Sequence, residues 1–197
     1  MSELKNKFYD ISFSGIENND SLRKIANARL KLHKIKVMKG DIRNLSSLPR
    51  NQYDILICQR VLINLLEKKH QAQALKNLID LVKKNGIMIF IEAFKSNLNN
   101  LNDARKEFGL EVLPPAHHNL YLEDNFFKNS LIKLYDNSSE NNLSTHYFLS
   151  RVIHPVFLKS SGLELKRNSH FVSFFSQALP DSIGNYSILR MLAFLKK

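Results

Sequence analysis

The chain has 197 residues and a formal net charge of +11, from 29 lysines and arginines against 18 aspartates and glutamates. Hydrophobic residues make up 44% and charged residues 24%, which is ordinary for a soluble globular domain and excludes collagen-like and fully disordered chains. No apolar run reaches the roughly 18–20 residues that a membrane span needs, no hydrophobic leader is visible, and a single cysteine, Cys58, excludes an internal disulfide. We expect a cytoplasmic protein with one domain, residues 1–197.

The positive charge is spread along the chain, with no run of lysines longer than two. Asparagine and isoleucine are common beside the lysines, as in proteins encoded by AT-rich DNA. The charge therefore favours compositional drift over a nucleic-acid footprint, and we do not expect a nucleic-acid partner.

The first half alternates short apolar segments with helical patterns, which predicts a parallel sheet covered by helices. A nearly continuous apolar run predicts that the strand Tyr53–Cys58 is buried on both faces, so that a charge at Ile57 would destabilise the fold. The other expected strands are Ile11–Ile16, Ile35–Met38 and Ile87–Glu92, and the expected helices are Ser21–Leu32, capped by Asp20 or Ser21, and His70–Lys84.

The second half has a different pattern. Paired prolines make Leu113–Tyr121 a loop, because proline fits neither a helix interior nor a central strand. Helices are expected at Leu98–Phe108, Asn125–Leu134 and Thr145–Leu158, and a closing pair of strands at Phe171–Ala178 and Ser187–Leu195.

Polar residues follow the expected strands at their carboxyl ends, where open α/β sheets bind ligands. Glu17 ends the first strand, and Asp41 with Ile42 follows the second. A carboxylate at the first place can accept hydrogen bonds from both ribose hydroxyls. An aspartate at the second can accept from the exocyclic amine of adenine while Ile42 covers the ring. These are the parts of an adenosine site.

With these residues in place, the sequence resembles the class I S-adenosylmethionine-dependent methyltransferases over residues 1–95. The resemblance implies a Rossmann-like α/β sheet, mostly parallel with an antiparallel C-terminal strand, and S-adenosyl-L-methionine as cofactor. It adds Gln59 and Arg60, after the third strand, as groups near the cofactor's carboxylate, and it makes residues 96–197 the acceptor side. The segments that carry it are Phe13-Ser-Gly-Ile-Glu17, Met38-Lys-Gly-Asp41-Ile, Tyr53-Asp54-Ile-Leu-Ile-Cys and Leu81-Val-Lys-Lys-Asn-Gly86-Ile-Met-Ile-Phe.

One feature of the family has no counterpart in the chain. Its acidic, glycine-rich loop after the first strand wraps the methionine half of the cofactor, whereas the glycines at 15, 40, 86, 109, 162 and 184 are too far apart to form one. We therefore expect a truncated methyltransferase fold without its first strand, which by itself binds the cofactor very weakly or not at all and is inactive. The strands ending at Glu17 and Cys58 should stand apart or pair directly, and their freed edges should favour self-association or a partner chain.

On the acceptor side, Glu92, His118 and Tyr121 are candidates to shape the pocket for the methyl acceptor. His118 is a weak candidate for a general base toward a hydroxyl, with an ordinary loop histidine as the alternative. No metal is expected, because the adjacent His117 and His118 point in different directions and no third ligand is spaced nearby. A small-molecule or glycan-type acceptor is favoured over nucleic acid, because no Asn/Asp-Pro-Pro-Tyr-type loop follows the third strand.

Two other functions remain open. A nicotinamide-dependent oxidoreductase also places a carboxylate after its second strand, but it needs a glycine-rich turn, and the sequence has no Tyr-x-x-x-Lys pair. The alternative retained is a non-catalytic, methyltransferase-like partner subunit that docks through an open sheet edge.

Overall fold

The computed structural model describes residues 1–197 except 9, 128–130, 138–142 and 165–168. It divides into two compact units, Met1–Pro49 and Arg50–Lys197, which are described separately. The single domain over residues 1–197, with halves on either side of residue 95, stays a prediction. Among the described residues, no helix is long and apolar enough to cross a membrane.

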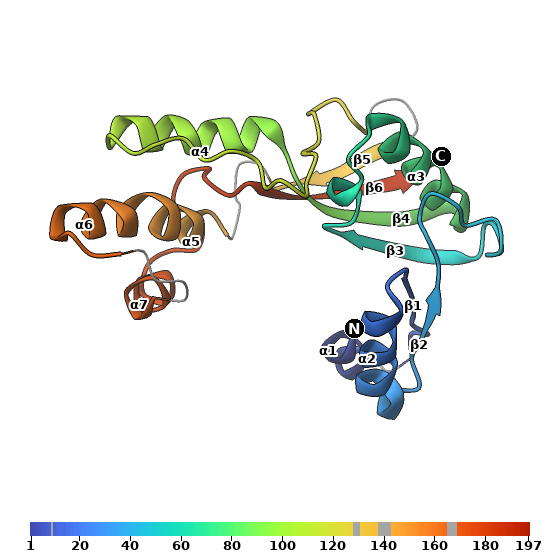
Figure 1. The fold of residues 1–197 in the computed structure, drawn as a ribbon. Helices are drawn as coiled ribbons and strands as arrows, with labels where there is room; N and C mark the ends of the chain where they lie inside the picture. Colours follow the sequence, from blue (N-terminus) through green and yellow to red (C-terminus); the bar gives the residue numbers. More distant parts are fainter. Residues whose placement is uncertain (9, 128–130, 138–142, 165–168) are drawn as a thin grey trace. The chain divides into compact units, whose positions relative to one another are not determined.

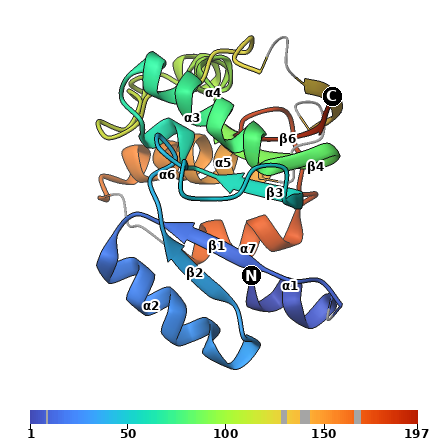
Figure 2. The same ribbon diagram turned by 90° about the vertical axis from the view of Figure 1, so that its right-hand side faces the viewer.

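The first unit is built on two parallel strands, β1 (Ser14–Glu17) and β2 (Lys36–Lys39), joined by helix α2 (Asp20–Leu30). Figure 2 shows α2 alongside this strand pair, with the short helix α1 (Ser2–Lys7) near the N-terminus. Apolar side chains in α2 and β2 and next to the two strands form the core of the unit. These are the buried Leu30, Ile35 and Val37, with Phe13 and Ala26 packed against them.

Asparagine side chains set the position of α2. The cap of the helix is Asn19, whose Oδ1 accepts from the Leu22 N–H at 3.0 Å, one residue before the two expected caps. In the last part of the helix, the amide of Asn27 donates to the Val37 carbonyl and accepts from the Val37 N–H, both at 2.9 Å. The helix is therefore fastened to β2 by a pair of hydrogen bonds in addition to its apolar face.

The second unit contains a four-stranded mixed sheet in the order β3-β4-β6-β5 (Figure 1). Strand β3 pairs in parallel with β4, and β6 runs antiparallel to both of its neighbours. This confirms the expected α/β fold with an antiparallel C-terminal strand. The strands are β3 (Tyr53–Gln59), β4 (Val82–Ala93), β5 (Leu131–Asp136) and β6 (Leu189–Lys196).

The strands that end near Glu17 and Cys58 lie in different sheets, so of the two expected arrangements, standing apart or pairing directly, the structure excludes direct pairing. Within the described residues, β3 has β4 as its one neighbour and an open opposite edge. The side chains of Ile55 and Ile57 are 49% and 51% exposed. The expectation that β3 is buried on both faces is therefore wrong: Ile55 and Ile57 are two residues apart and share one face of the strand, and that face is only partly covered.

Helix α3 (Lys68–Leu81) ends three residues before the expected Lys84. At its C-terminus, the Lys196 ammonium donates to the carbonyls of Ile79 and Val82 at 2.8 and 2.6 Å. The Ile79 carbonyl also accepts from the Val82 N–H, and a cation beside the last carbonyls of a helix interacts favourably with its C-terminal dipole. The helix can therefore stop at Leu81, and Val82, a β-branched residue, already belongs to β4.

The remaining helices lie together beyond one end of the four-stranded sheet, whereas α3 lies beside it (Figure 1). The packing centre of this group is the cluster of Leu101, Ala104 and Val152. The helices are α4 (Lys95–Glu107), α5 (Ser144–Phe148), the π-helical segment η3 (Leu149–Ile153), α6 (His154–Ser161) and α7 (His170–Ala178).

Two expected elements of the second half are wrong. The segment Phe171–Ala178 is the helix α7 and not a strand, because Phe171 and Phe175 lie four residues apart on one face with ring centroids 4.7 Å apart. The partner of β6 is instead β5 (Leu131–Asp136), which occupies the end of the expected helix Asn125–Leu134. Residues 128–130 of that expected helix lie outside the described residues.

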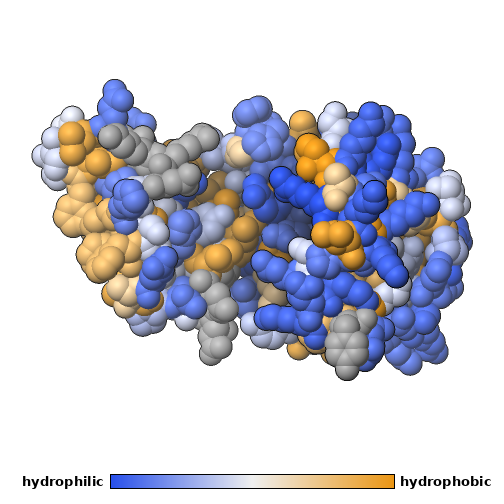
Figure 3. All heavy atoms as spheres, turned by 90° about the horizontal axis from the view of Figure 1, so that it is seen from below, coloured by the Kyte–Doolittle hydropathy of each residue, from blue (hydrophilic) through white to orange (hydrophobic). Residues whose placement is uncertain are grey.

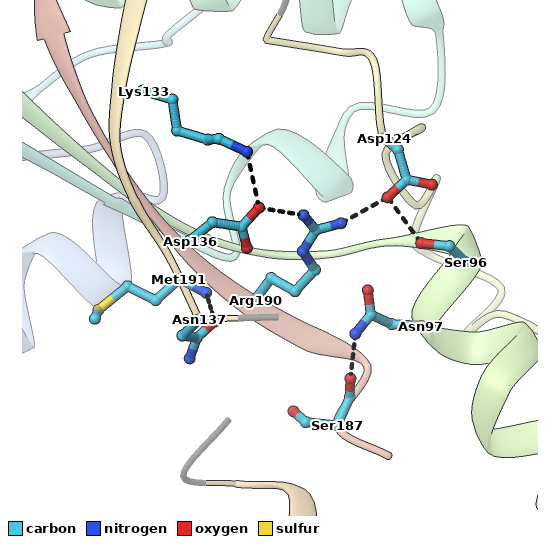
Figure 4. A network of polar contacts seen from close by, with 9 residues as sticks. All are labelled: Ser96, Asn97, Asp124, Lys133, Asp136, Asn137, Ser187, Arg190 and Met191. Carbon is cyan, nitrogen blue, oxygen red and sulfur yellow. Dashed lines mark hydrogen bonds and ion pairs between the residues drawn. The ribbon is translucent and has the colours of Figure 1, made fainter. Parts of the chain in front are cut away.

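Arg190, at the start of β6, joins the strands to the segment before β5 (Figure 4). Its guanidinium donates to Asp124 at 2.6 Å and to Asp136 at 2.7 Å, and it stacks over the Phe94 ring at 4.6 Å. Asp124 also accepts from the Ser96 hydroxyl in α4 at 2.9 Å. One mostly buried cation therefore connects β5 and β6 and, through Asp124, the start of α4 at this end of the sheet.

Candidate functional site

In the first unit, the expected adenosine residues lie at the carboxyl ends of two paired parallel strands. Glu17 is opposite Lys39 in the register of β1 and β2, and Asp41 follows two residues after Lys39, with Ile42 next to it. Side chains at the carboxyl ends of neighbouring parallel strands share one edge of the sheet. The structure therefore places the three residues Glu17, Asp41 and Ile42 at the same edge.

The two carboxylates of this edge differ in their contacts. Glu17 is half-buried, and its Oε1 accepts from the Asn19 N–H at 2.7 Å, at the start of α2. Asp41 accepts from the Arg43 N–H at 2.9 Å and from the Arg43 guanidinium through both of its oxygens. Glu17 fits a ribose hydroxyl through Oε2, whereas an adenine amine would share the Asp41 carboxylate with Arg43.

In the second unit, Gln59 and Arg60 are exposed at the carboxyl end of β3. Arg60 has a φ of 53°, in the left-handed region that residues other than glycine rarely adopt. The Arg60 N–H donates to the Ile91 carbonyl of β4 at 2.8 Å, and the Arg60 carbonyl accepts from the side-chain amide of Asn64 at 2.9 Å. The chain therefore turns sharply after β3, and these bonds hold the turn.

Glu92 lies next to this turn, near the end of β4, and its side chain is fully buried. Its carboxylate accepts from the N–H groups of Val61, Leu62 and Ile63 at 3.0, 3.1 and 3.4 Å. Burial raises the pKa of Glu92 to about 6, against the opposing effect of these hydrogen bonds. Burial also raises the pKa of the neighbouring Cys58 thiol, which donates to the Glu92 carboxylate at 3.5 Å.

The other two acceptor-side candidates differ in exposure. Tyr121 is buried and lines a cavity of about 560 Å³ between α3 and residues 121–126, together with Leu75, Ile79 and Phe126. His118 is exposed in a turn, with its ring 4.9 Å from that of His117. The acceptor-side roles of Glu92, His118 and Tyr121, and the catalytic role of His118, stay predictions.

Tyr147 of α5 is a polar residue of this region that the sequence patterns did not single out. The pKa of Tyr147 is raised, mainly by burial. The positive charges of Arg60 and Arg151 oppose this rise, and Tyr121 adds to it. Tyr147 is therefore a half-buried phenol on the helical side of the unit. The four-residue spacing of Tyr147 and Arg151, which places them on one helix face, is the signal that could have found them.

A second, fully apolar hollow of about 330 Å³ lies among the C-terminal helices. Its lining includes Phe148, Phe157, Phe171 and Phe175. Figure 3 shows hydrophobic side chains gathered over this part of the surface, where Phe157 and Phe174 are 54% and 65% exposed. These aromatic residues pack as a cluster with the neighbouring helices.

Comparison with known proteins identifies the fold. Residues 1–90 match the model of a methyltransferase domain. A protein from Pyrococcus horikoshii OT3 has 15% identity and a TM-score of 0.60 over 100% of this chain and 76% of its own. No curated protein matches the sequence.

Two further solved structures carry enzyme names. One is a putative sarcosine dimethylglycine methyltransferase from Galdieria sulphuraria, with 14% identity and a TM-score of 0.56 over 100% of this chain and 74% of its own. The other is the geranyl diphosphate C-methyltransferase of Streptomyces coelicolor A3(2) in complex with S-adenosyl-L-homocysteine, with 8% identity and a TM-score of 0.57 over 100% and 68%. The chain thus has the fold of the class I S-adenosylmethionine-dependent methyltransferases, and its first 90 residues match a methyltransferase domain.

Proposed function

We propose that the chain is an S-adenosylmethionine-dependent methyltransferase, or an incomplete copy of one, that acts on a small-molecule or glycan-type acceptor. The observation that carries this proposal is the shared edge of β1 and β2, which brings Glu17, Asp41 and Ile42 together. A carboxylate beside an aspartate–isoleucine pair at the carboxyl ends of parallel strands suits an adenosine moiety.

Each of the proposed residues has a role toward a different part of the ligand. Glu17 accepts from the ribose hydroxyls, Asp41 from the adenine amine, and Ile42 covers the ring. The resemblance assigns Gln59 and Arg60 to the same cofactor, where the guanidinium of Arg60 pairs with the carboxylate of its amino-acid end. The six glycines include no closely spaced pair, so the backbone donors of a glycine-rich loop are lacking and binding should be weak.

When bound, S-adenosylmethionine supplies a sulfonium methyl group that passes to a nucleophilic acceptor atom as the carbon–sulfur bond breaks. This chemistry depends on positioning and exclusion of water more than on acid–base groups, which agrees with the lack of a catalytic cluster in the sequence. His118 would take the proton of a hydroxyl acceptor, and Glu92 and Tyr121 stay proposed acceptor-side residues. Solved neighbours named for dimethylglycine and geranyl diphosphate support a small acceptor.

The test is a titration of the whole chain with S-adenosylhomocysteine and with adenosine, followed by ligand-observed NMR because the expected affinities are low. Glu17→Gln should weaken both ligands, since both carry the ribose. Arg60→Met should weaken S-adenosylhomocysteine and leave adenosine unchanged. Glu3→Gln, an exposed glutamate in α1, is the matched control. Undiminished binding of both ligands by Glu17→Gln would refute the ribose assignment.

A second candidate function is a non-catalytic partner subunit, favoured by the open edge of β3. Ile55 and Ile57 are half-exposed on β3, and no other strand of the described residues pairs with its second edge. Such an edge can add a strand from a second copy of the chain or from another protein. We propose that the chain self-associates through this edge. Its other proposed partner is the small-molecule methyl acceptor.

A further inference from the structure

Glu92 is a carboxylate that lies entirely inside the second unit, and its bonds go to the loop after β3. Oε1 accepts from the N–H groups of Val61 and Leu62, and Oε2 accepts from the N–H of Ile63. These are three successive backbone donors at the start of the 3-10 turn η2 (Leu62–Asn64), which the turn itself cannot satisfy. One side chain from β4 therefore satisfies all three.

The rest of the loop is held from other directions. The buried amide of Gln71 in α3 donates to the Leu62 carbonyl at 3.2 Å and to the Leu120 carbonyl at 2.7 Å. The Leu120 N–H donates to the Ile63 carbonyl at 2.7 Å. The loop is thus fastened to β4, α3 and the segment at 120, while the residues at its start, Gln59 and Arg60, remain exposed.

Burying a carboxylate in the core has an energetic cost. Its desolvation disfavours the charged form, and an apolar side chain of similar volume would avoid that penalty. An apolar side chain, however, would leave the N–H groups of Val61, Leu62 and Ile63 without acceptors, two of them at buried residues. The arrangement therefore suits a loop whose backbone path has to be held rather than a core that only has to be filled.

We infer that Glu92 is a positioning residue, which holds the turn after β3 so that Gln59 and Arg60 meet the amino-acid end of the bound ligand. This inference rests on the proposed function for the identity of the ligand. The holding of the loop itself rests on the contacts of Glu92. Arg60 is linked directly to this scaffold, because its left-handed backbone is bonded to Ile91, the neighbour of Glu92.

The first arm of the test is residue-resolved amide hydrogen exchange on the whole chain. In Glu92→Ala, exchange at Val61, Leu62 and Ile63 should accelerate about tenfold or more, the factor expected for losing a hydrogen bond to a charged group. Amides of the β4–β6 ladder should keep their protection. Glu92→Gln retains one carbonyl oxygen and replaces the other with an amide nitrogen, so a single loop amide should lose most of its protection. Glu107→Gln, an exposed glutamate in α4, is the control.

The second arm compares the affinities for S-adenosylhomocysteine and adenosine. Glu92→Ala should lower the affinity for S-adenosylhomocysteine relative to that for adenosine, to the value found for Arg60→Met. Its affinity for adenosine should not change. Unaltered loop exchange in both Glu92 variants would overturn the inference, as would a loosened loop with an unaltered ratio of the two affinities. If the unmodified chain binds neither ligand, the proposed function fails while the exchange arm still decides whether Glu92 holds the loop. If Glu92→Ala does not fold, Glu92→Gln decides both arms.

Discussion

Glu92 on β4 and Arg190 on β6 are directly opposed in the antiparallel ladder, and their charged groups bond to different parts of the unit. Glu92 accepts from the backbone of the loop after β3, whereas Arg190 donates to Asp124 and Asp136. Opposed residues of an antiparallel pair lie on the same face of the sheet. This pair therefore fastens one end of the sheet to two segments that are far apart in sequence, the β3 turn and the segment before β5.

Replacement of Arg190 should strongly destabilise the second unit. Arg190→Met removes two charge-assisted hydrogen bonds and leaves the mostly buried Asp136 with a weaker set of partners, at a cost of about 3–5 kcal/mol. Lys133→Met, which removes the exposed partner of Asp136, should cost about 0–1 kcal/mol. Urea unfolding followed by circular dichroism measures both. Equal losses in the two variants would show that the guanidinium does not organise the network.

The stability of the chain should depend on pH through Glu92. Its pKa rises from 4.5 to about 6 on folding, so the protonated form favours the fold. The stabilisation is fully present below pH 4.5 and is lost as the pH rises through 6, by about 2 kcal/mol. Glu92→Gln cannot titrate at this position and should lack the decline. Free energies of unfolding measured from pH 4 to 7 test this, and parallel curves for the two proteins would contradict it.

The open edge of β3 should drive self-association. Ile57 is half-exposed, so Ile57→Lys should be tolerated by the fold and should reduce association by placing a charge on the edge. This replaces the sequence-based expectation that a lysine at position 57 would destabilise the chain. Sedimentation velocity at several concentrations provides the measurement. The control is Ile132→Lys on the opposite edge strand β5, where Ile132 is 45% exposed. A monomer at every concentration would exclude the edge as an interface.

The cap of α3 by Lys196 should be measurable as stability. The ammonium donates to the Ile79 and Val82 carbonyls and to the Asn51 side chain at 2.9 Å. Lys196→Met should lower the free energy of unfolding by about 1–3 kcal/mol, because it removes hydrogen bonds from a charged donor at the C-terminus of the helix. Lys197→Met, at the exposed neighbouring residue, should have little effect. Thermal unfolding of the two variants compares them, and similar losses would point to net charge rather than to the cap.

The elements whose signals are local can be read from the sequence alone. The apolar segments around Ile16, Val37, Ile57 and Ile89 are strands because each is short, apolar and bounded by helical patterns. The positions of Glu17 and Asp41 follow from this order, since residues after neighbouring parallel strands meet at one edge. The wide spacing of the glycines was likewise readable without a structure, and with it the absence of a glycine-rich loop.

The tertiary structure decided what depends on distant partners. The segment Phe171–Ala178 is apolar enough for a strand or a helix, and its packing against His154 and Phe157 makes it a helix. The burial of Glu92 could not be read from position 92, because its acceptor oxygens are used by N–H groups about 30 residues away. Local patterns record what a segment can form, and contacts between distant segments select one of the possibilities, since most of the free energy of packing comes from those contacts.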